Sequence, residues 1–432
     1  MEQKSVLAIA EPHRFYRQTE AQVAPARPLV LDSFAGAGGL SLGFQLAGFH
    51  ISGAIEIDKW ACETFAFNHP EAKVLQRDIV SVSNEEIRDA FSGDKQPAVL
   101  VGGPPCQGFS IANKKAGDAK DPRNSLFREF VRLGALLEPD LLVMENVPNL
   151  LTVKTSEGQR VIDIITESLR DIGYQVAHTV LSATDFGIPQ IRTRLFIVAS
   201  RRPLISPFPE PTHIWRTDAA PTLFDKDLTQ TPTLWDAISD LPVLEAGAGA
   251  EEQQYVDPEQ TPYQALLREG SRILFNHKAM NHGKRMVQRF ASMECGQSGN
   301  DVADELKPRR RNSDEIAVQA YDQNNRRMFP DRPCHTIPAS FYANFVHPTQ
   351  HRNFTAREGA RIQSFPDWYR FLGKPTVVSH ALLAREERYH ERFLCQYSQI
   401  GNAVPPMLAK AVAANLLNQI HWSTQCSYTA II

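Results

Sequence analysis

The sequence has little of what marks secreted, zinc-binding or membrane proteins. Its six cysteines form no CxxC pair and no short secreted framework, which argues for reduced thiols and against a zinc site or a disulfide scaffold. No apolar run could cross a bilayer, and the brief one near the N-terminus is interrupted by Glu11 and Pro12. We therefore expect a soluble, cytoplasmic protein with no bound metal and no membrane partner. The cysteines are Cys62, Cys106, Cys295, Cys334, Cys395 and Cys426.

An excess of basic charge is also missing. Lys and Arg number 46 against 49 Asp and Glu, which gives a formal net charge of −3, so no global positive field marks a nucleic-acid-binding protein. A basic cleft on an otherwise balanced surface is still compatible with this composition. With 42% hydrophobic residues among 432, the chain can bury one large core or two unequal ones.

Short apolar runs alternate with amphipathic stretches after a polar, unpatterned tail over residues 1–28. This rhythm is typical of an α/β fold with a mostly parallel sheet covered on both faces, and such sheets bind ligands beyond the carboxyl ends of their strands. The predicted strands cover residues 29–34, 51–57, 74–79, 98–103, 141–147 and 194–200, and the predicted helices 40–48, 59–69, 126–137 and 158–173.

The alternation stops near Arg201, where a proline-rich stretch indicates a domain boundary. Regular structure returns with a helix at TAREGARIQSF, where Thr355 and Glu358 have capping-box spacing, and with a late helix whose first turn holds Pro405 and Pro406. The predicted domains are a catalytic and cofactor-binding domain over 29–205 completed by 396–421, a small irregular domain over 206–372, and a helical insertion over 373–395.

A glycine-rich turn joins the first predicted strand to the first helix, in DSFAGAGGLSLGF at residues 32–44. Glycines there let a ligand approach the backbone, and the helix start offers free N–H groups. Glu56 ends the second strand, where a carboxylate suits a ribose diol, and Asp78 ends the third, where it suits an adenine amino group. Two solvated acids in loops would give the same pattern.

Three further features lie at predicted strand ends. Cys106 follows an apolar strand and the turn GGPP, which presents a thiol at the strand tip. Glu145 follows four apolar residues, so burial should raise its pKa and let it hold a proton; a Glu paired with a basic residue is the structural alternative. Arg192 and Arg194 alternate along an extended segment and suit a phosphate or carboxylate, unless they cover a solvated strand face.

In this order the motifs resemble the DNA (cytosine-5) methyltransferase family of bacterial restriction–modification type, which uses S-adenosylmethionine. The resemblance covers about residues 29–200 and 352–419. It implies an S-adenosylmethionine-dependent Rossmann-like domain with a mostly parallel sheet, plus a smaller irregular target-recognition domain. The motifs that carry it are DSFAGAGG, GGPPCQGFS, ENV, QIRTR, REGARIQSFPD and QIGNAVPP.

The resemblance implies roles for each candidate. Cys106 would add to C6 of a cytosine flipped out of the duplex, Glu145 would protonate ring nitrogen N3, and Arg192 and Arg194 would hold the flipped nucleotide. Cofactor contacts would come from Phe34, Ala35, Gly36, Ala37, Gly38, Gly39, Glu56, Ile57, Asp78, Ile79, Pro105, Leu126, Asn402 and Val404. DNA contacts would come from Gln107, Ser110, Arg123, Arg309, Arg310, Arg311, Arg326 and Arg327, with a solvated loop as the alternative for the run at 307–311.

We therefore predict a monomeric, sequence-specific DNA cytosine-5 methyltransferase that acts on double-stranded DNA and protects it from a cognate restriction endonuclease. A tRNA cytosine-5 methyltransferase of the same lineage is one alternative, although the long segment between Arg201 and Arg352 favours duplex DNA. A DNA-binding regulator without catalysis is another, and the intact Cys106, Glu145 and arginine pair argue against it.

Overall fold

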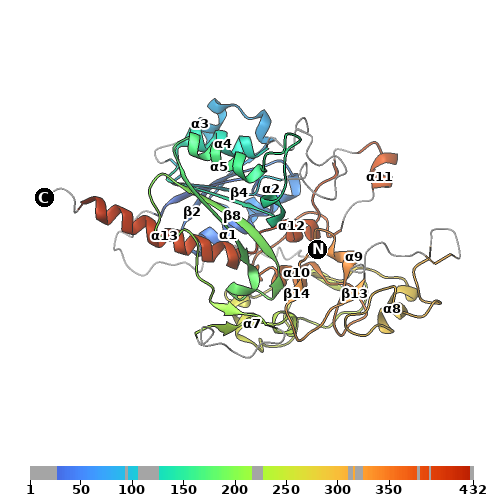
Figure 1. The fold of residues 1–432 in the computed structure, drawn as a ribbon. Coiled ribbons are helices and arrows are strands. Elements are labelled where there is room, and N and C mark those ends of the chain that lie inside the picture. Colours follow the sequence, from blue (N-terminus) through green and yellow to red (C-terminus); the bar gives the residue numbers. More distant parts are fainter. Residues whose placement is uncertain are drawn as a thin grey trace, which may run out of the picture.

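A seven-stranded sheet forms the centre of the computed structural model, which describes residues 27–92, 96–105, 126–216, 227–309, 315–316, 325–376, 380–388 and 391–428. Its strand order is β3-β2-β1-β4-β5-β8-β6 (Figure 1). The pairs from β3 to β5 are parallel, and β8 runs antiparallel to both of its neighbours. The strands are β1 (Leu29–Ser33), β2 (His50–Glu56), β3 (Lys73–Gln76), β4 (Val99–Gly102), β5 (Leu141–Asn146), β6 (Gln175–Ser182) and β8 (Thr193–Ser200).

The predicted α/β class and mostly parallel sheet are confirmed. All six expected strands are present, and β6 is the one strand of this sheet that was not expected. That strand lies at the edge, and most of its side chains are partly or fully exposed. It therefore lacks the continuous apolar run by which buried parallel strands are found in a sequence.

Helices cover both faces of the sheet. On one face, α1 and α13 pack on alternate strand residues such as Val30, Val99 and Val143. On the other, α3, α4 and α5 pack on the intervening residues, including Leu31 and Leu142 (Figure 1). The helices of this part are α1 (Gly39–Leu46), α2 (Lys59–Asn68), α3 (Asn84–Phe91), α4 (Leu126–Leu137), α5 (Val161–Asp171), α12 (Gln396–Asn402) and α13 (Pro406–Tyr428).

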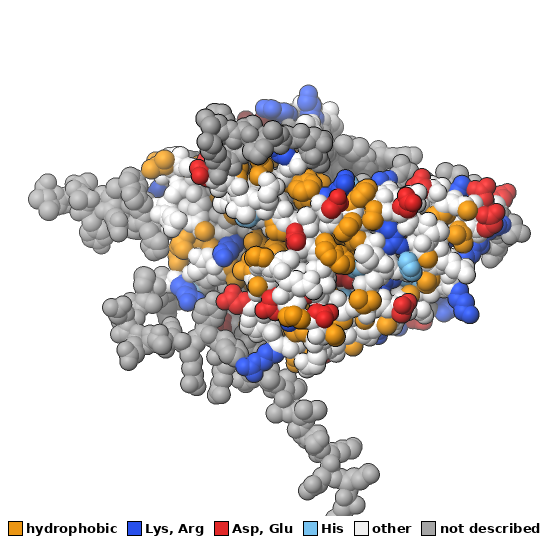
Figure 2. Space-filling model, turned by 90° about the horizontal axis from the view of Figure 1, so that it is seen from below, with side chains coloured by type: hydrophobic (Ala, Val, Ile, Leu, Met, Phe, Trp, Pro, Cys, Tyr) orange, Lys and Arg blue, Asp and Glu red, His pale blue; other side chains and the backbone are white. Residues whose placement is uncertain are grey.

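The region after β8 contains short elements and two-stranded pairings. Its helices are α6 (Leu234–Ile238), α7 (Pro262–Arg268), α8 (Lys284–Ala291), α9 (Phe341–Asn344), α10 (Ala356–Ile362) and α11 (His380–Arg385). Its strands are β9 (His213–Ile214), β10 (Thr229–Gln230), β11 (Gly249–Gln253), β12 (Leu274–Lys278), β13 (Arg326–Arg327), β14 (Cys334–His335) and β15 (Phe345–Val346); β14 pairs with β7 (Gln190–Ile191). The view from below in Figure 2 shows Lys and Arg, Asp and Glu, and apolar side chains interspersed over the described part of that face.

One apolar cluster joins this region to the sheet. It combines Phe354 and Phe365, on either side of α10, with Leu42 of α1 and Ile400 of α12. The expected capping box of α10 is present, because Thr355 Oγ1 accepts the Glu358 N–H and the Glu358 carboxylate accepts the Thr355 N–H. The domain boundaries predicted above stay a prediction.

The 373–395 segment was expected to be a helical insertion. Within its described residues, α11 is the one α-helix. Among all helices in the described part of the chain, none combines the length and the hydrophobicity that a bilayer crossing requires.

Candidate active site

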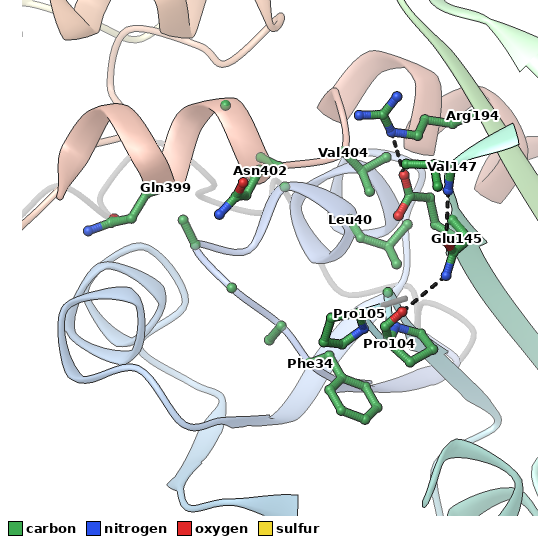
Figure 3. Close-up of a pocket in the computed structure, with 18 of the residues that line it drawn as sticks. Phe34, Leu40, Pro104, Pro105, Glu145, Val147, Arg194, Gln399, Asn402 and Val404 are labelled. Atoms are coloured by element: carbon green, nitrogen blue, oxygen red, sulfur yellow. Dashed lines mark hydrogen bonds and ion pairs between the residues drawn. The ribbon is translucent and has the colours of Figure 1, made fainter. Parts of the chain in front are cut away.

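A cavity of about 1120 Å³ opens at the carboxyl ends of β1, β2, β4 and β5. We call it the strand-end cavity. The strand ends form one wall of this cavity, and α12 with the residues that follow it forms the opposite wall. Gln399 and Asn402 therefore lie across from Pro104 and Pro105 (Figure 3). Parallel sheets place ligand sites at this edge. The first motif, DSFAGAGG, and the last, QIGNAVPP, both contribute residues to the cavity there.

The glycine-rich turn after β1 forms the cavity floor. Its backbone N–H groups at Phe34 and Ala35 both donate to the Ile55 carbonyl of the adjacent strand. Phe34 has φ 63°, a left-handed conformation that non-glycine residues rarely adopt. A Cβ at Gly39 would lie 2.4 Å from the Val404 carbonyl oxygen, so the absence of a side chain there lets α1 begin directly against the opposite wall.

Glu56 is fixed at the end of β2 by backbone donors. Its Oε2 accepts the Gly36 N–H at 2.7 Å, and its Oε1 accepts the N–H groups of Ile57 and Asp58 at 2.9 Å each. Burial raises the pKa of this carboxyl even though these bonds favour its charged form. The carboxylate therefore has a fixed position in the cavity wall.

Asp32 is a second buried carboxylate in this wall, at the end of β1. Ser41 donates to its Oδ2 at 2.6 Å, whereas Oδ1 has no hydrogen-bond partner among the described residues. Burial, followed by the nearby charge of Glu56, raises the pKa of Asp32 to about 7. Asp32 was not among the expected site residues, although its position at the end of the strand next to that of Glu56 is a signal that could have indicated it.

Glu145 and Arg194 form an ion pair at the other end of the cavity. Arg194 Nε lies 2.9 Å from Glu145 Oε1, and the two side chains are only 14% and 13% exposed (Figure 3). Burial raises the pKa of Glu145, and the attraction of Arg194 and Arg192 only partly offsets this effect. Its second oxygen lies 3.2 Å from the position that a Cβ of Gly103 would take, so glycine keeps this side of the carboxyl group clear.

The turn that leads to Cys106 is tied to the strand that carries Glu145. Asn146 donates from Nδ2 to the Pro104 carbonyl at 3.0 Å, and its Oδ1 accepts the Val147 N–H (Figure 3). Cys106 itself lies outside the described residues. Cys106, the predicted nucleophile, thus comes directly after Pro104 and Pro105 in the sequence. Pro104 is bonded to Asn146, which follows the predicted acid Glu145.

A family model for C-5 cytosine-specific DNA methylases matches residues 29–418, which include both walls of the strand-end cavity. The chain belongs to this family. It is therefore a DNA (cytosine-5) methyltransferase. Its sheet, covered by helices on both faces, is the one found in methyltransferases that depend on S-adenosylmethionine.

Similar proteins with assigned functions support this assignment. The methyltransferase is 44% identical over 390 residues to type II methyltransferase M.DdeI of Desulfomicrobium norvegicum, covering 90% of this chain and 88% of that protein. It is 35% identical to M1.HphI of Haemophilus parahaemolyticus, with 90% and 86% covered. Among solved structures, an E. coli prophage protein described as a DNA modification methyltransferase is similar with TM-score 0.67 and 25% identity over 91% of this chain and 99% of that one.

Ten of the fourteen expected cofactor residues of the methyltransferase line the strand-end cavity. Of the other four, Gly38 lies against the Tyr369 hydroxyl, and Asp78 caps a short 3₁₀ turn by accepting the Val80 N–H. Ile79 and Leu126 belong to the apolar cluster on the α4 side of the sheet. These four are not brought into the cavity. The ten are Phe34, Ala35, Gly36, Ala37, Gly39, Glu56, Ile57, Pro105, Asn402 and Val404.

Arg192 lies in the wall of the strand-end cavity. The residue is 2% exposed, and its guanidinium donates to the carbonyls of Ile337, Gly401 and Ala403 at 3.0–3.1 Å. These bonds occupy its Nη1 and Nη2 groups and join the β7–β8 connection to α12 and to the segment around Ile337. The expected contact of Arg192 with a flipped nucleotide stays a prediction.

Arg327 requires a correction among the expected DNA contacts. It is 3% exposed and donates to the carbonyls of His347, Pro348 and Phe290, so it supports the small domain from inside. Arg309 is exposed and Arg326 is half-buried. The remaining expected contacts, Gln107, Ser110, Arg123, Arg310 and Arg311, lie outside the described residues.

Several lining residues in or beside the motifs were not among the expected site residues. Val147 ends the ENV motif and Asn149 follows it, whereas Gln399 begins the QIGNAVPP motif and Leu394 precedes it. Adjacency to a strand-end Glu could have indicated Val147. No pattern in the sequence pointed to Leu394, because it belongs to the predicted insertion.

Proposed function

We propose that the methyltransferase transfers a methyl group from S-adenosylmethionine to C5 of a flipped cytosine within a specific duplex sequence, through a covalent bond between Cys106 and C6. We further propose that this methylation protects DNA from a cognate restriction endonuclease. The observation that carries the proposal is one cavity with Glu145, whose pKa is raised, at one end and Glu56, held by backbone donors, at the other.

The cavity residues fit S-adenosylmethionine. Glu56 has lone pairs left for a ribose diol, and the partnerless Oδ1 of buried Asp32 suits the ammonium group of the methionine part. Phe34 and Ile57 supply apolar surface beside them. When bound, the cofactor supplies a methyl group on a positively charged sulfur.

Cytosine C5 is too weak a nucleophile to take that methyl group unaided. Addition of the Cys106 thiolate to C6 moves the electron pair of the C5–C6 double bond toward C5, which then attacks the methyl carbon. Loss of the C5 proton to a base and departure of the thiolate restore the aromatic ring. The products are 5-methylcytosine, S-adenosylhomocysteine and one proton, so atoms and charges balance.

Glu145 is the proposed proton donor to N3 of the ring. Because burial raises its pKa, the carboxyl group keeps its proton to a higher pH than an exposed Glu does, and protonating N3 makes C6 electrophilic. Arg194 fixes one carboxyl oxygen at 2.9 Å, which leaves the oxygen above Gly103 to face the base. The target carbon is inaccessible in a stacked duplex, so the cytosine must rotate into the cavity.

The small domain is the proposed reader of the target sequence. Exposed Arg309 and half-buried Arg326 are the described candidates for contacts to phosphates or guanine edges. The buried Arg327 has no part in that contact surface.

The direct test is methyl transfer from labelled S-adenosylmethionine to three acceptors: duplex DNA of diverse sequence, the same DNA single-stranded, and total tRNA. We expect label in duplex DNA only, and none with Cys106→Ser. Label in tRNA alone would favour the RNA enzyme of this lineage, and no transfer despite cofactor and DNA binding would favour the inert regulator. Plasmid methylated in cells should resist one endonuclease that cuts the labelled sequence, which tests protection separately.

A further inference from the structure

The two ends of the 373–395 segment are pressed against one side chain of α2, Trp60. Gly373 lies so close to the indole that an added Cβ would be 2.6 Å from its Cγ, and glycine also permits the φ of +82° found there. Phe393, near the other end, contacts the same indole with ring centroids 5.4 Å apart. The segment thus leaves and rejoins the fold at a single point beside the strand-end cavity.

Hydrogen bonds close this base. Thr64 of α2 accepts the Leu372 N–H at 2.8 Å and donates to Gln399 at 2.7 Å. Gln399 in turn donates to the carbonyls of Leu372 and Leu394, at 3.0 and 2.8 Å. The Gln396 N–H donates to the Lys374 carbonyl at 3.0 Å. The residues that precede and end the segment are therefore tied to each other as well as to α2.

Leu394 is held on both sides of its own backbone. Its N–H donates to Asp58 Oδ2 at 2.8 Å, and its carbonyl accepts from Gln399. Asp58 also caps α2 through Oδ1, which accepts the Ala61 N–H at 2.9 Å. The backbone position of Leu394 thus depends on groups of the catalytic fold, and its half-buried side chain is among those that line the cavity.

The apolar surface at this side of the cavity comes from two chain segments. Ile57 is 63% exposed, so it does not enclose a ligand by itself. Leu394 lines the same cavity, and its N–H is bonded to Asp58, the residue that follows Ile57. Because Ile57 directly follows Glu56, the proposed ribose partner, both side chains lie at the nucleoside end of the cavity.

We propose that the end of the 373–395 segment is part of the cofactor site, where Leu394 packs on the nucleoside part of S-adenosylmethionine and strengthens its binding. This inference rests on the proposed function. The side chain supplies contact area in a position set before the ligand arrives, so the binding free energy is not reduced by ordering it. Because it carries no group that exchanges protons or electrons, it changes affinity and leaves the chemical step unaltered.

The test is calorimetric binding of S-adenosylmethionine and S-adenosylhomocysteine to the full-length protein and to Leu394→Ala. Removing the isobutyl group should weaken both ligands about five- to tenfold, with kcat at saturating cofactor within about twofold of wild type. Leu394→Met, which keeps the apolar volume, should restore most of the affinity. Arg388→Ala is the matched control in the same segment, since its side chain pairs only with Glu386 and Glu391 in the described contacts, and it should bind both ligands like wild type.

The outcomes separate this inference from the function on which it rests. Wild type that binds both ligands while Leu394→Ala binds them equally well would overturn the role of Leu394 and leave the methyltransferase proposal intact. Equal losses in Leu394→Ala and Arg388→Ala would also overturn it, because the segment would then act only through stability. Wild type that binds neither ligand would overturn both proposals.

Discussion

Buried charges serve different purposes in the two halves of the methyltransferase. Around the sheet, the core is apolar, and the buried or half-buried acids Asp32, Glu56 and Glu145 stand at strand ends in one cavity. In the small domain, whole ion pairs are buried beside an apolar cluster. We infer that ionisable groups in the first half perform chemistry, whereas those in the second half determine shape.

The small-domain network shows how such burial is stabilised. Arg361 is fully buried and bonds to Asp367 at 2.7 and 3.0 Å, and it also contacts Asp240. Arg352 is likewise buried and bonds to both oxygens of Glu358 at 2.9 and 2.7 Å. Burial alone would raise the pKa of Glu358, but Arg352 lowers it below its usual range. Each charge is thus satisfied by a bidentate partner.

The acids of the cavity show the opposite behaviour. The pKa of Asp32 is raised to about 7, and those of Glu56 and Glu145 are also raised, because burial outweighs their favourable contacts. Groups held in this way keep their protons to higher pH than exposed acids do, and such shifts cluster at functional sites. The contrast predicts that variants around the cavity will lose activity, whereas variants in the small-domain network will lose stability.

Glu145→Gln should give the largest effect on activity. Removing the proton donor is expected to lower kcat about 10²- to 10⁴-fold, while cofactor affinity stays near wild type. Single-turnover methylation at saturating DNA measures this loss. A decrease of less than about threefold would mean that Glu145 is not the acid.

The same residue should govern the pH dependence of the wild type. Because its pKa is raised, Glu145 retains a proton at pH values where an exposed Glu is ionised, and kcat should fall as the pH rises through that pKa. Glu145→Gln should lack this decrease. An identical alkaline limb in both proteins would assign the titration to another group.

Arg361→Met should show the reverse pattern, with a large effect on stability. It leaves the carboxylates of Asp240 and Asp367 buried without their shared partner, which costs about 3–5 kcal/mol of unfolding free energy. Urea denaturation measures this loss, and Arg361→Lys should lose less because it keeps the charge. Arg388→Met, on an exposed ion pair, is the control and should leave the unfolding midpoint unchanged. Equal stability of Arg361→Met and wild type would break the distinction between the halves.

Asp32→Asn should give the smallest effect, confined to the pH dependence of cofactor binding. If ionised Asp32 pairs with the ammonium group, the affinity for S-adenosylhomocysteine should rise roughly tenfold from pH 6 to pH 8, because the carboxyl with a pKa of about 7 loses its proton in that window. The variant should bind with little pH dependence. Titration calorimetry at several pH values distinguishes the two, and parallel curves would exclude this pairing.

The same contrast explains which parts of the fold and of the site could be predicted from the sequence. Apolar strands and the glycine turn are encoded locally, so the sheet, the cavity floor and Glu145 could be predicted, as could the capping box at Thr355. Burial of Arg192 and Arg327 could not, because alternation alone does not distinguish an arginine that faces solvent from one that faces carbonyls supplied by distant segments. The place of Leu394 was hidden for the same reason, since residues of α2 and α12 fix it.

The most direct test of the central claim is a trap for the covalent bond to Cys106. The protein would be incubated with S-adenosylmethionine and duplexes that carry 5-fluorocytosine in many sequence contexts, because fluorine at C5 blocks the final elimination. We predict a protein–DNA adduct that survives denaturant, forms in one sequence context and is absent in Cys106→Ala. Failure of the wild type to form an adduct with any duplex while it binds the cofactor would contradict the account.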